Sequence, residues 1–286
     1  MTDPRAVLRR AGLAPKKSFG QNFLVDANVT RAIAAACVPE GEVGRARVVE
    51  LGAGTGALTS ALLARAAHVV AVERDRDLVP LLTEAFAAES ADGRLAVVEA
   101  DAQSIEPRAL FGDHEGPDPR VLAGNLPYQI TGRLLELAVR AAKDVDRVVF
   151  MVQREVAERL LAAPATKDYG ALTVFVRAAY DVARVMNVSP GSFHPPPEVM
   201  STVVALTPCR PARAEETPSF RALVKGAFGM RRKTLRNAWS ALGAARVAEA
   251  AAAAGVSLDA RGETLDVEGF ARMAAELDRA AAREPS

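Results

Sequence analysis

The chain has 286 residues, half of them hydrophobic and a quarter charged, with a formal net charge of +1 at pH 7. This composition is typical of a soluble globular protein with one large and one small domain, and no apolar run is long enough to span a membrane. Cys37 and Cys209 stand in unrelated contexts. Because neither cysteine shows metal-type or redox-type spacing, we expect a cytoplasmic protein without a metal site. The absence of a long apolar run leads us to expect no membrane segment.

Short β-branched runs alternate with helical patterns over the first two thirds of the chain. After an N-terminal arm (residues 1–27), the pattern predicts a helix at 28–38, a strand at 47–51, a helix at 56–65, strands at 68–73 and 95–99 around a helix at 75–89, and strands at 121–124 and 147–153 around a helix at 131–143. Strand–helix alternation with short apolar strands predicts a parallel, doubly wound α/β sheet of the Rossmann-like kind.

The last third of the chain changes character. Two strand-like runs at 183–188 and 201–207 flank a Pro-rich loop at 190–197 and predict an antiparallel hairpin at the sheet edge. A Pro-, Arg- and Glu-rich stretch at 208–218 resembles a linker, and helices are expected at 220–229, 233–242, 245–254 and 267–279. We therefore expect a Rossmann-like domain at 28–208 and a small C-terminal helical domain at 209–286, with Trp239 in the core of the latter.

A glycine-rich segment, Glu50-Leu51-Gly52-Ala53-Gly54-Thr55-Gly56, follows the first predicted strand and opens a helix. Such a loop lets the backbone turn sharply and approach a ligand at the carboxyl end of a strand. Glu73 ends the next strand, where a carboxylate can accept two hydrogen bonds from a ribose diol. These features fit a methyltransferase, a nicotinamide oxidoreductase, or a tight turn without a ligand.

Two further features favour the methyltransferase. Asp101 follows the third strand, where a carboxylate can accept from the amine of adenine. Asn125-Leu126-Pro127-Tyr128 follows the fourth strand. An aromatic amine is a poor nucleophile, because its lone pair is delocalised into the ring. An Asn carbonyl and a carbonyl beside proline can accept hydrogen bonds from its two hydrogens and so direct the lone pair at a sulfonium methyl. Tyr128 offers a flat face for a base, so catalysis would rest on positioning and electrostatics.

Five segments of the chain carry a family resemblance. They are Lys17-Ser18-Phe19-Gly20-Gln21-Asn22-Phe23-Leu24, the glycine loop, Asn125 to Tyr128, Phe193-His194-Pro195-Pro196-Pro197, and Arg232-Lys233-Thr234-Leu235-Arg236-Asn237. In order and over roughly residues 16–240, the chain resembles the ribosomal RNA adenine dimethyltransferases. The branch that dimethylates two adjacent adenines near the 3′ end of small-subunit (16S) RNA is the better match. The large-subunit macrolide-resistance enzymes are the nearest alternative.

The resemblance implies S-adenosyl-L-methionine as cofactor and a role for each matching residue. Asn22 and Leu24 would close over the methionine part of the cofactor, and Phe193 would stack on the target base opposite Tyr128. The implied cofactor-binding residues are Gln21, Asn22, Leu24, Gly52, Gly54, Glu73, Asp101, Ala102 and Asn125, and the implied catalytic residues are Asn125, Pro127, Tyr128 and Phe193.

Basic residues gather at both ends of the chain. The cluster Arg231, Arg232, Lys233 and Arg236 has helical spacing and predicts contact with RNA phosphates. The expected partner is small-subunit ribosomal RNA in an assembling 30S particle, bound by a monomeric enzyme. Two alternatives stay open at this point: a non-catalytic ribosome assembly factor and a dinucleotide oxidoreductase.

Overall fold

The computed structural model describes residues 3–112, 116–230 and 232–283. Its contacts divide the chain into two units. Unit 1 comprises Met1–Ala157 and Val182–Pro208, and unit 2 comprises Glu158–Asp181 and Cys209–Ser286. The sequence predicted a single domain boundary at residue 208, which would place the segment Glu158–Asp181 in the first domain. The structure places this segment in unit 2 because its side chains, Tyr169 and Val174 among them, belong to the core of that unit.

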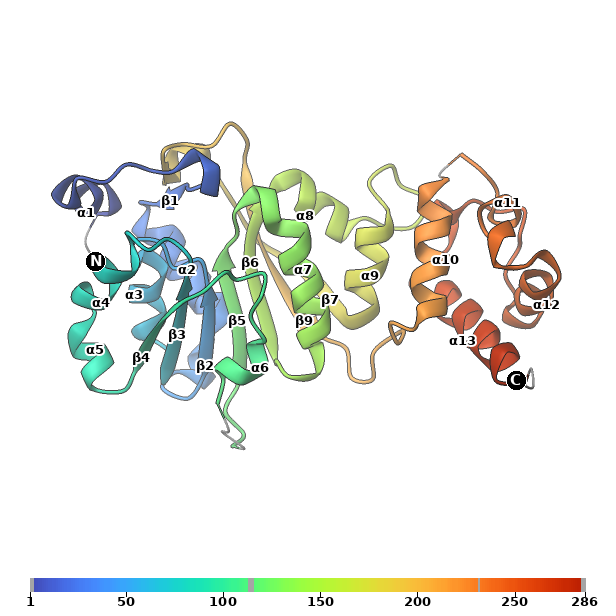
Figure 1. Cartoon of the computed structure of the whole chain (residues 1–286), viewed down its shortest axis with the longest axis horizontal. Helices are drawn as coiled ribbons and strands as arrows, with labels where there is room; N and C mark the ends of the chain where they lie inside the picture. Colours follow the sequence, from blue (N-terminus) through green and yellow to red (C-terminus); the bar gives the residue numbers. More distant parts are fainter. Residues whose placement is uncertain (1–2, 113–115, 231, 284–286) are drawn as a thin grey trace. The chain divides into compact units, whose positions relative to one another are not determined.

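The described residues of unit 1 form a seven-stranded sheet (Figure 1). Its strand order is β4 (Leu95–Glu99), β3 (His68–Glu73), β2 (Arg47–Leu51), β5 (Arg120–Asn125), β6 (Arg147–Gln153), β9 (Ser201–Pro208) and β7 (Tyr180–Val188). The first five strands are parallel, and β9 is antiparallel to β6. The predicted doubly wound α/β sheet is therefore confirmed, and β9 and β7 are neighbours at its edge as expected.

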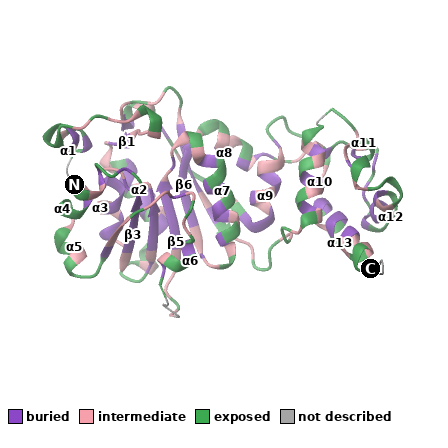
Figure 2. Ribbon diagram, viewed as in Figure 1, coloured by how far each residue is buried: buried purple, intermediate pink, exposed green. Residues whose placement is uncertain are grey.

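Helices cover both faces of this sheet. The helices of this part of the chain are α1 (Pro4–Ala11), α2 (Ala27–Cys37), α3 (Ala57–Leu63), α4 (Val79–Ala85), α5 (Ala87–Ala91), α6 (Pro107–Leu110), α7 (Thr131–Arg140) and α8 (Arg154–Leu161). Helices α2 and α3 lie on one face and α7 on the other (Figure 1). Because both faces are covered, the inner strands are mainly apolar rather than alternating, and Figure 2 shows them buried.

The predicted helix at 75–89 was wrong in its extent. Its first residues form a loop instead, because the Asp75 carboxylate accepts the backbone N–H of Asp77 and so favours a turn. Helix α4 then starts with Pro80 in its first turn and ends at Ala85, because the backbone leaves the helical region at Phe86. The ring of Phe86 packs where a Cβ on Gly56 would stand, 2.4 Å from its Cε2.

Unit 2 is helical, as predicted, around a core of large aromatic side chains. Its helices are α9 (Ala171–Ala179), α10 (Pro218–Gly229), α11 (Leu235–Ala238), α12 (Ala244–Ala254) and α13 (Val267–Arg283). Trp239 is fully buried and donates from Nε1 to the carbonyl of Leu223 at 2.8 Å, which confirms its predicted place in the core. Tyr169 is also buried, and its hydroxyl donates to the Leu265 carbonyl.

The helices predicted from the sequence were incomplete in two respects. The expected helix at 233–242 is divided into α11 and a short 3-10 turn at Ser240–Leu242, because Trp239 leaves helical backbone geometry where its indole enters the core. Helices α8 and α9 were not predicted. Within the described residues, no helix combines the length and the apolar character needed to cross a membrane.

Candidate active site

The glycine loop after β2 forms one wall of a cavity of about 740 Å³ that is open to solvent. Gly54 and Gly56 have φ values of 60° and 83°, a region that favours glycine over any residue with a side chain. The backbone N–H of Gly54 donates to Oε2 of Glu73 at 2.8 Å. The loop and the end of β3 are thus held together at the carboxyl edge of the sheet, where ligands bind in such folds.

Two carboxylates follow neighbouring strands along this wall. Glu73 is 6% exposed, and its Oε1 accepts from the backbone N–H of Asp75 at 2.8 Å. Burial raises the pKa of Glu73, while hydrogen bonds from Asp75, Gly54 and Arg74 oppose the shift. Asp101 follows β4 and accepts from the backbone N–H of Gln103. A carboxylate has about four lone-pair sites. Glu73 accepts from three backbone N–H groups and keeps one site for a ligand, whereas Asp101 also accepts from Gln103 Nε2 and would exchange that contact for one with a ligand.

The segment Asn125 to Tyr128, at the end of the neighbouring strand β5, lines the same cavity, and a Cβ on Gly52 would stand 3.9 Å from the Asn125 carbonyl oxygen. We call this segment the acceptor wall, and the glycine loop with Glu73 and Asp101 the cofactor wall. The amide Nδ2 of Asn125 donates to the backbone carbonyl of Asn22 at 2.9 Å, which leaves its Oδ1 as the end that can accept from a ligand. The carbonyl of Pro127 already accepts from Ile130 N and from Thr131 Oγ1, both at 3.1 Å. The Leu126 carbonyl is therefore the better backbone acceptor in this segment.

Tyr128 completes the acceptor side of the cavity. Its hydroxyl lies 2.8 Å from Ser201 Oγ, and the side chain lines the cavity. Burial raises the pKa of the phenol, against the lowering effect of the Ser201 hydrogen bond. A neutral Tyr128 whose hydroxyl is anchored presents its ring as a fixed surface on which a flat base can stack.

Ten of the predicted site residues line this one cavity. They are Gln21, Asn22, Gly52, Gly54, Glu73, Asp101, Ala102, Asn125, Pro127 and Tyr128. The cavity lining does not include the predicted Leu24 and Phe193. These two are paired neighbours in the short antiparallel sheet of β1 (Phe23–Leu24) and β8 (Phe193–His194), 4% and 3% exposed, and belong to the hydrophobic core. A stacking role for Phe193 stays a prediction.

Sequence reasoning missed two residues that line the cavity beside Asp101. The guanidinium of Arg74 lies 4.5 Å from the centroid of the Phe19 ring and 3.5 Å from Oδ2 of Asp101. Both Phe19 and Arg74 line the cavity. The available signal was position alone: Arg74 directly follows Glu73, and Phe19 stands within the same N-terminal segment as Gln21 and Asn22.

A third missed residue, Glu50, lies beneath the glycine loop. It is 1% exposed and accepts from Thr59 Oγ1 at 2.6 Å. Burial raises the pKa of Glu50 to about 8; the Thr59 hydrogen bond lowers it and the nearby charge of Glu73 raises it further. Glu50 is thus mainly neutral at pH 7, which spares the cavity a second buried negative charge beside Glu73.

The predicted RNA-contacting cluster lies in unit 2. Arg232 and Lys233 are exposed in the connection between α10 and α11, and Arg236 lies on α11. Arg236 is not free of acidic neighbours: it pairs with Asp259 at 3.1 Å, because the loop that carries Asp259 packs against α11. Arg231 lies outside the described residues.

The cavity has the features that a nucleoside-containing cofactor requires. Carboxylates suited to a ribose diol and an adenine amine lie beside a glycine loop, and the segment Asn125 to Tyr128 lines the same cavity. The roles of these side chains can be explained without a second pocket that would hold a nicotinamide ring. Across the described ranges, no group of three or more His, Cys, Asp or Glu side chains is placed to hold a metal ion. Fold and site together define a Rossmann-like methyltransferase.

Comparison with known proteins takes this class to a family. Residues 12–279 match the model of the family described as ribosomal RNA adenine dimethylase. A ribosomal RNA small subunit methyltransferase A from Anaeromyxobacter sp. (strain K) is 46% identical, with 96% of this chain and 98% of that protein covered. One from Geobacter metallireducens is 42% identical, with 93% and 96% covered. The chain belongs to the ribosomal RNA adenine dimethylase family.

Solved structures share the fold of this chain. A dimethyladenosine transferase from Plasmodium falciparum shares the fold with a TM-score of 0.74 at 24% identity, and covers 91% of this chain and 98% of its own. The 23S rRNA methyltransferase ErmE has a TM-score of 0.65 at 26% identity, with 90% and 100% covered. The predicted family and the predicted methyltransferase activity are confirmed, and the oxidoreductase alternative is wrong.

Proposed function

We propose that this enzyme transfers methyl groups from S-adenosyl-L-methionine to the N6 amines of two adjacent adenosines near the 3′ end of small-subunit (16S) ribosomal RNA, two to each amine. The observation that carries the proposal is the hydrogen bond from Asn125 Nδ2 to Asn22, which leaves the carbonyl end of Asn125 for an amine. The named relatives, small-subunit methyltransferases similar over nearly their whole length, support the choice of substrate.

The cofactor roles follow from the chemistry of the cavity. Glu73 would accept from the ribose hydroxyls and Asp101 from the adenine amine, while the backbone of Gly52 and Gly54 would lie against the methionine part. The further residues proposed for cofactor binding are Gln21, Asn22, Leu24, Ala102 and Asn125. When bound, the cofactor would supply an electrophilic methyl group on a sulfonium.

The acceptor side would prepare the adenine amine. The carbonyls of Asn125 and Leu126 would accept its two hydrogens, which localises the nitrogen lone pair and points it along the line of transfer. Pro127 fixes the loop and adds no competing N–H. Stacking on Tyr128, at about 1–3 kcal/mol per aromatic face, would offset much of the cost of taking the base out of its stack. Phe193 would add the second face.

The second methylation places a particular demand on this arrangement. A singly methylated amine has one hydrogen left, so Asn125 and Leu126 would hold it with one hydrogen bond instead of two. The methyl already added must then rotate into space that the first hydrogen had occupied. We therefore expect the second transfer to depend more strongly on stacking against Tyr128 than the first.

The proposed partner is small-subunit ribosomal RNA in an assembling 30S particle. Arg232, Lys233 and Arg236, with Arg231, would contact RNA phosphates, and the exposure of Arg232 and Lys233 supports this role. We also propose that the enzyme acts as a monomer and works in the cytoplasm, where ribosomal subunits are assembled in bacteria such as those that supply the named relatives.

The test is incubation with labelled S-adenosylmethionine and small subunits lacking the modification, followed by nucleoside analysis by mass. Dimethyladenosine at two adjacent positions is the expected result. Label in large-subunit RNA instead would support adenine methylation but would assign the protein to the ErmE-like branch. Cofactor binding without transfer to either RNA would favour a non-catalytic assembly factor.

A further inference from the structure

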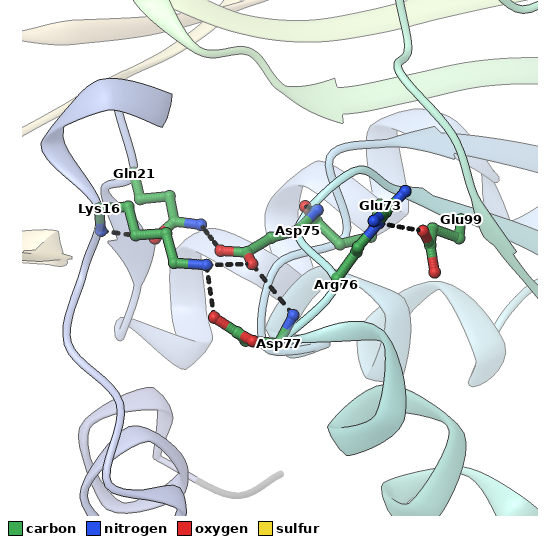
Figure 3. Close-up of polar contacts among 7 residues, drawn as sticks. All are labelled: Lys16, Gln21, Glu73, Asp75, Arg76, Asp77 and Glu99. Carbon is green, nitrogen blue, oxygen red and sulfur yellow. Dashed lines mark hydrogen bonds and ion pairs between the residues drawn. The ribbon is translucent and has the colours of Figure 1, made fainter.

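The N-terminal arm is fastened to the loop after β3 by a group of polar contacts (Figure 3). We call residues 16–24 the closing arm. Lys16 Nζ donates to Oδ1 of Asp75 at 2.5 Å and to Oδ2 of Asp77 at 2.6 Å. Gln21 Nε2 donates to the other oxygen of Asp75 at 2.7 Å, and its Oε1 accepts from the backbone N–H of Lys16. Two arm residues 59 and 54 positions away in sequence thus converge on one carboxylate.

Asp75 is buried while its partners on the arm are more exposed. The residue is 2% exposed, whereas the Lys16 side chain is 36% exposed. Burial alone would raise the pKa of Asp75, but hydrogen bonds from Lys16, Gln21 and the backbone of Asp77 outweigh it and hold the pKa below its ordinary value. The hydrogen bonds to Asp75 and Asp77 in turn raise the pKa of Lys16. Both groups are therefore charged at neutral pH.

Asp75 is also hydrogen-bonded to the cofactor wall, through Glu73. The backbone N–H of Asp75 donates to Oε1 of Glu73, and Oε2 of Glu73 accepts from Gly54 N, both at 2.8 Å. A continuous series of hydrogen bonds therefore runs from the closing arm through Asp75 and Glu73 to the glycine loop. Interactions of this kind tend to reinforce one another in a partly buried setting.

The closing arm also forms part of the cavity itself. Residues 19–23 line it, and the ring of Phe23 lies 3.1 Å from where a Cβ on Gly54 would stand. On the acceptor side, the Asn22 carbonyl receives the amide of Asn125. The arm thus connects the cofactor wall with the acceptor wall.

We propose that Asp75 is a positioning residue that holds the closing arm over the bound cofactor and sets the rate at which the cofactor is exchanged. The proposal rests on the proposed function, because four transfers to two adenines require the spent cofactor to leave repeatedly. Breaking the Lys16–Asp75 contact releases the arm at one point while its contacts with Asn125 and Gly54 remain. Asp75 touches neither the methyl group nor the target amine; it acts through Lys16 and Gln21.

The test compares Asp75→Asn and Lys16→Met with Arg76→Gln in the full-length protein. Arg76→Gln is the matched control: it removes an ion pair from the same loop, the 2.9 Å contact of Arg76 with Glu99, whose side chains are 86% and 47% exposed. We expect both test variants to weaken S-adenosylmethionine binding on the order of tenfold, through faster dissociation, because each removes a charge-assisted hydrogen bond. The control should bind like the wild type.

Two further readouts separate positioning from general damage. With RNA substrate, KM for the cofactor should rise in both test variants while kcat at saturating cofactor stays within about twofold, since the contact of Asn22 with Asn125 remains. Trypsin cleavage after Lys17 should become faster in both variants, as expected for a released arm. Because Lys16 is partly exposed, Lys16→Met keeps the test valid even where Asp75→Asn fails to fold.

Failure of the wild type to bind S-adenosylmethionine would overturn the proposed function and, with it, the premise of this inference. Binding by the wild type, with unchanged affinity, release rate and arm cleavage in both test variants, would overturn the role of Asp75 alone. An equal effect in Arg76→Gln would also overturn it, because the cause would then be the loop's charge and not its contact with the arm.

Discussion

Glu50 provides the sharpest test of the buried electrostatics beneath the glycine loop. Its pKa is about 8 in the fold, against 4.5 for the ordinary side chain, chiefly because burial disfavours the charged form. The folded chain therefore keeps a proton that the unfolded chain releases. The stability associated with this proton is fully present below pH 4.5 and is lost as the pH rises to 8.

The size of the effect follows from linkage. At about 1.4 kcal/mol per pH unit, the loss between pH 4.5 and pH 8 accumulates to about 5 kcal/mol at most. Glu50→Gln removes the titrating group but keeps an oxygen that can accept from Thr59 Oγ1, as the carboxyl does at 2.6 Å. We expect the variant to match the wild type near pH 5 and to exceed its free energy of unfolding by a few kcal/mol near pH 8.

Urea unfolding at pH 5, 6.5 and 8, followed by far-UV circular dichroism, measures this difference. The single tryptophan, Trp239, is in unit 2, so its fluorescence supplies an internal control that the substitution should leave unchanged. Glu99→Gln is the matched variant, because it removes an exposed carboxylate from the outer strand β4. Parallel pH profiles for the wild type and Glu50→Gln would refute the argument that Glu50 is held neutral.

Three other predictions test the site and the RNA surface. Gly124→Ala would place a Cβ 2.6 Å from a backbone carbonyl of β2, so urea unfolding should show a loss of about 1–3 kcal/mol, whereas Gly132→Ala, with open space in α7, should be neutral or stabilising. Asn125→Ala should lower kcat by roughly 10²–10³ while calorimetry still detects cofactor binding; near-normal kcat would contradict the acceptor role. Arg232→Gln with Lys233→Gln should reduce the salt dependence of RNA affinity by about two phosphate contacts, and an unchanged slope would remove both from the interface.

Much of unit 1 could be predicted because parallel strands leave strong local signals. A strand buried on both faces is a short apolar run, and β2, β3, β4 and β6 begin and end where such runs do. All parallel strands also end at the same edge of the sheet. Side chains at their carboxyl ends, such as Glu73 and Asn125, were therefore expected together before their contacts were known.

Other features had no comparable local signal. Helix α9 is followed directly by a strand, and its apolar run was not separable from the strand pattern by periodicity alone. The assignment of Glu158–Asp181 to unit 2 depends on tertiary packing, since Tyr169 finds its hydrogen-bond partner in Leu265, 96 residues away. Local sequence patterns cannot specify contacts at such separations.

The burial of Phe193 shows how a residue type can be identified while its placement is not. The motif around it indicates an aromatic side chain near the site, but pairing with Leu24 turns the ring into the core, where it is 3% exposed. A base could stack on this ring only after β1 and β8 shift. Because β1 is the C-terminal end of the closing arm, release of the arm from Asp75 should make such a shift easier, even though Phe23 still packs against Gly54. A target base that stacks on Phe193 should then bind more readily to Asp75→Asn than to the wild type, which the binding of a short adenosine-containing RNA to the two proteins can decide.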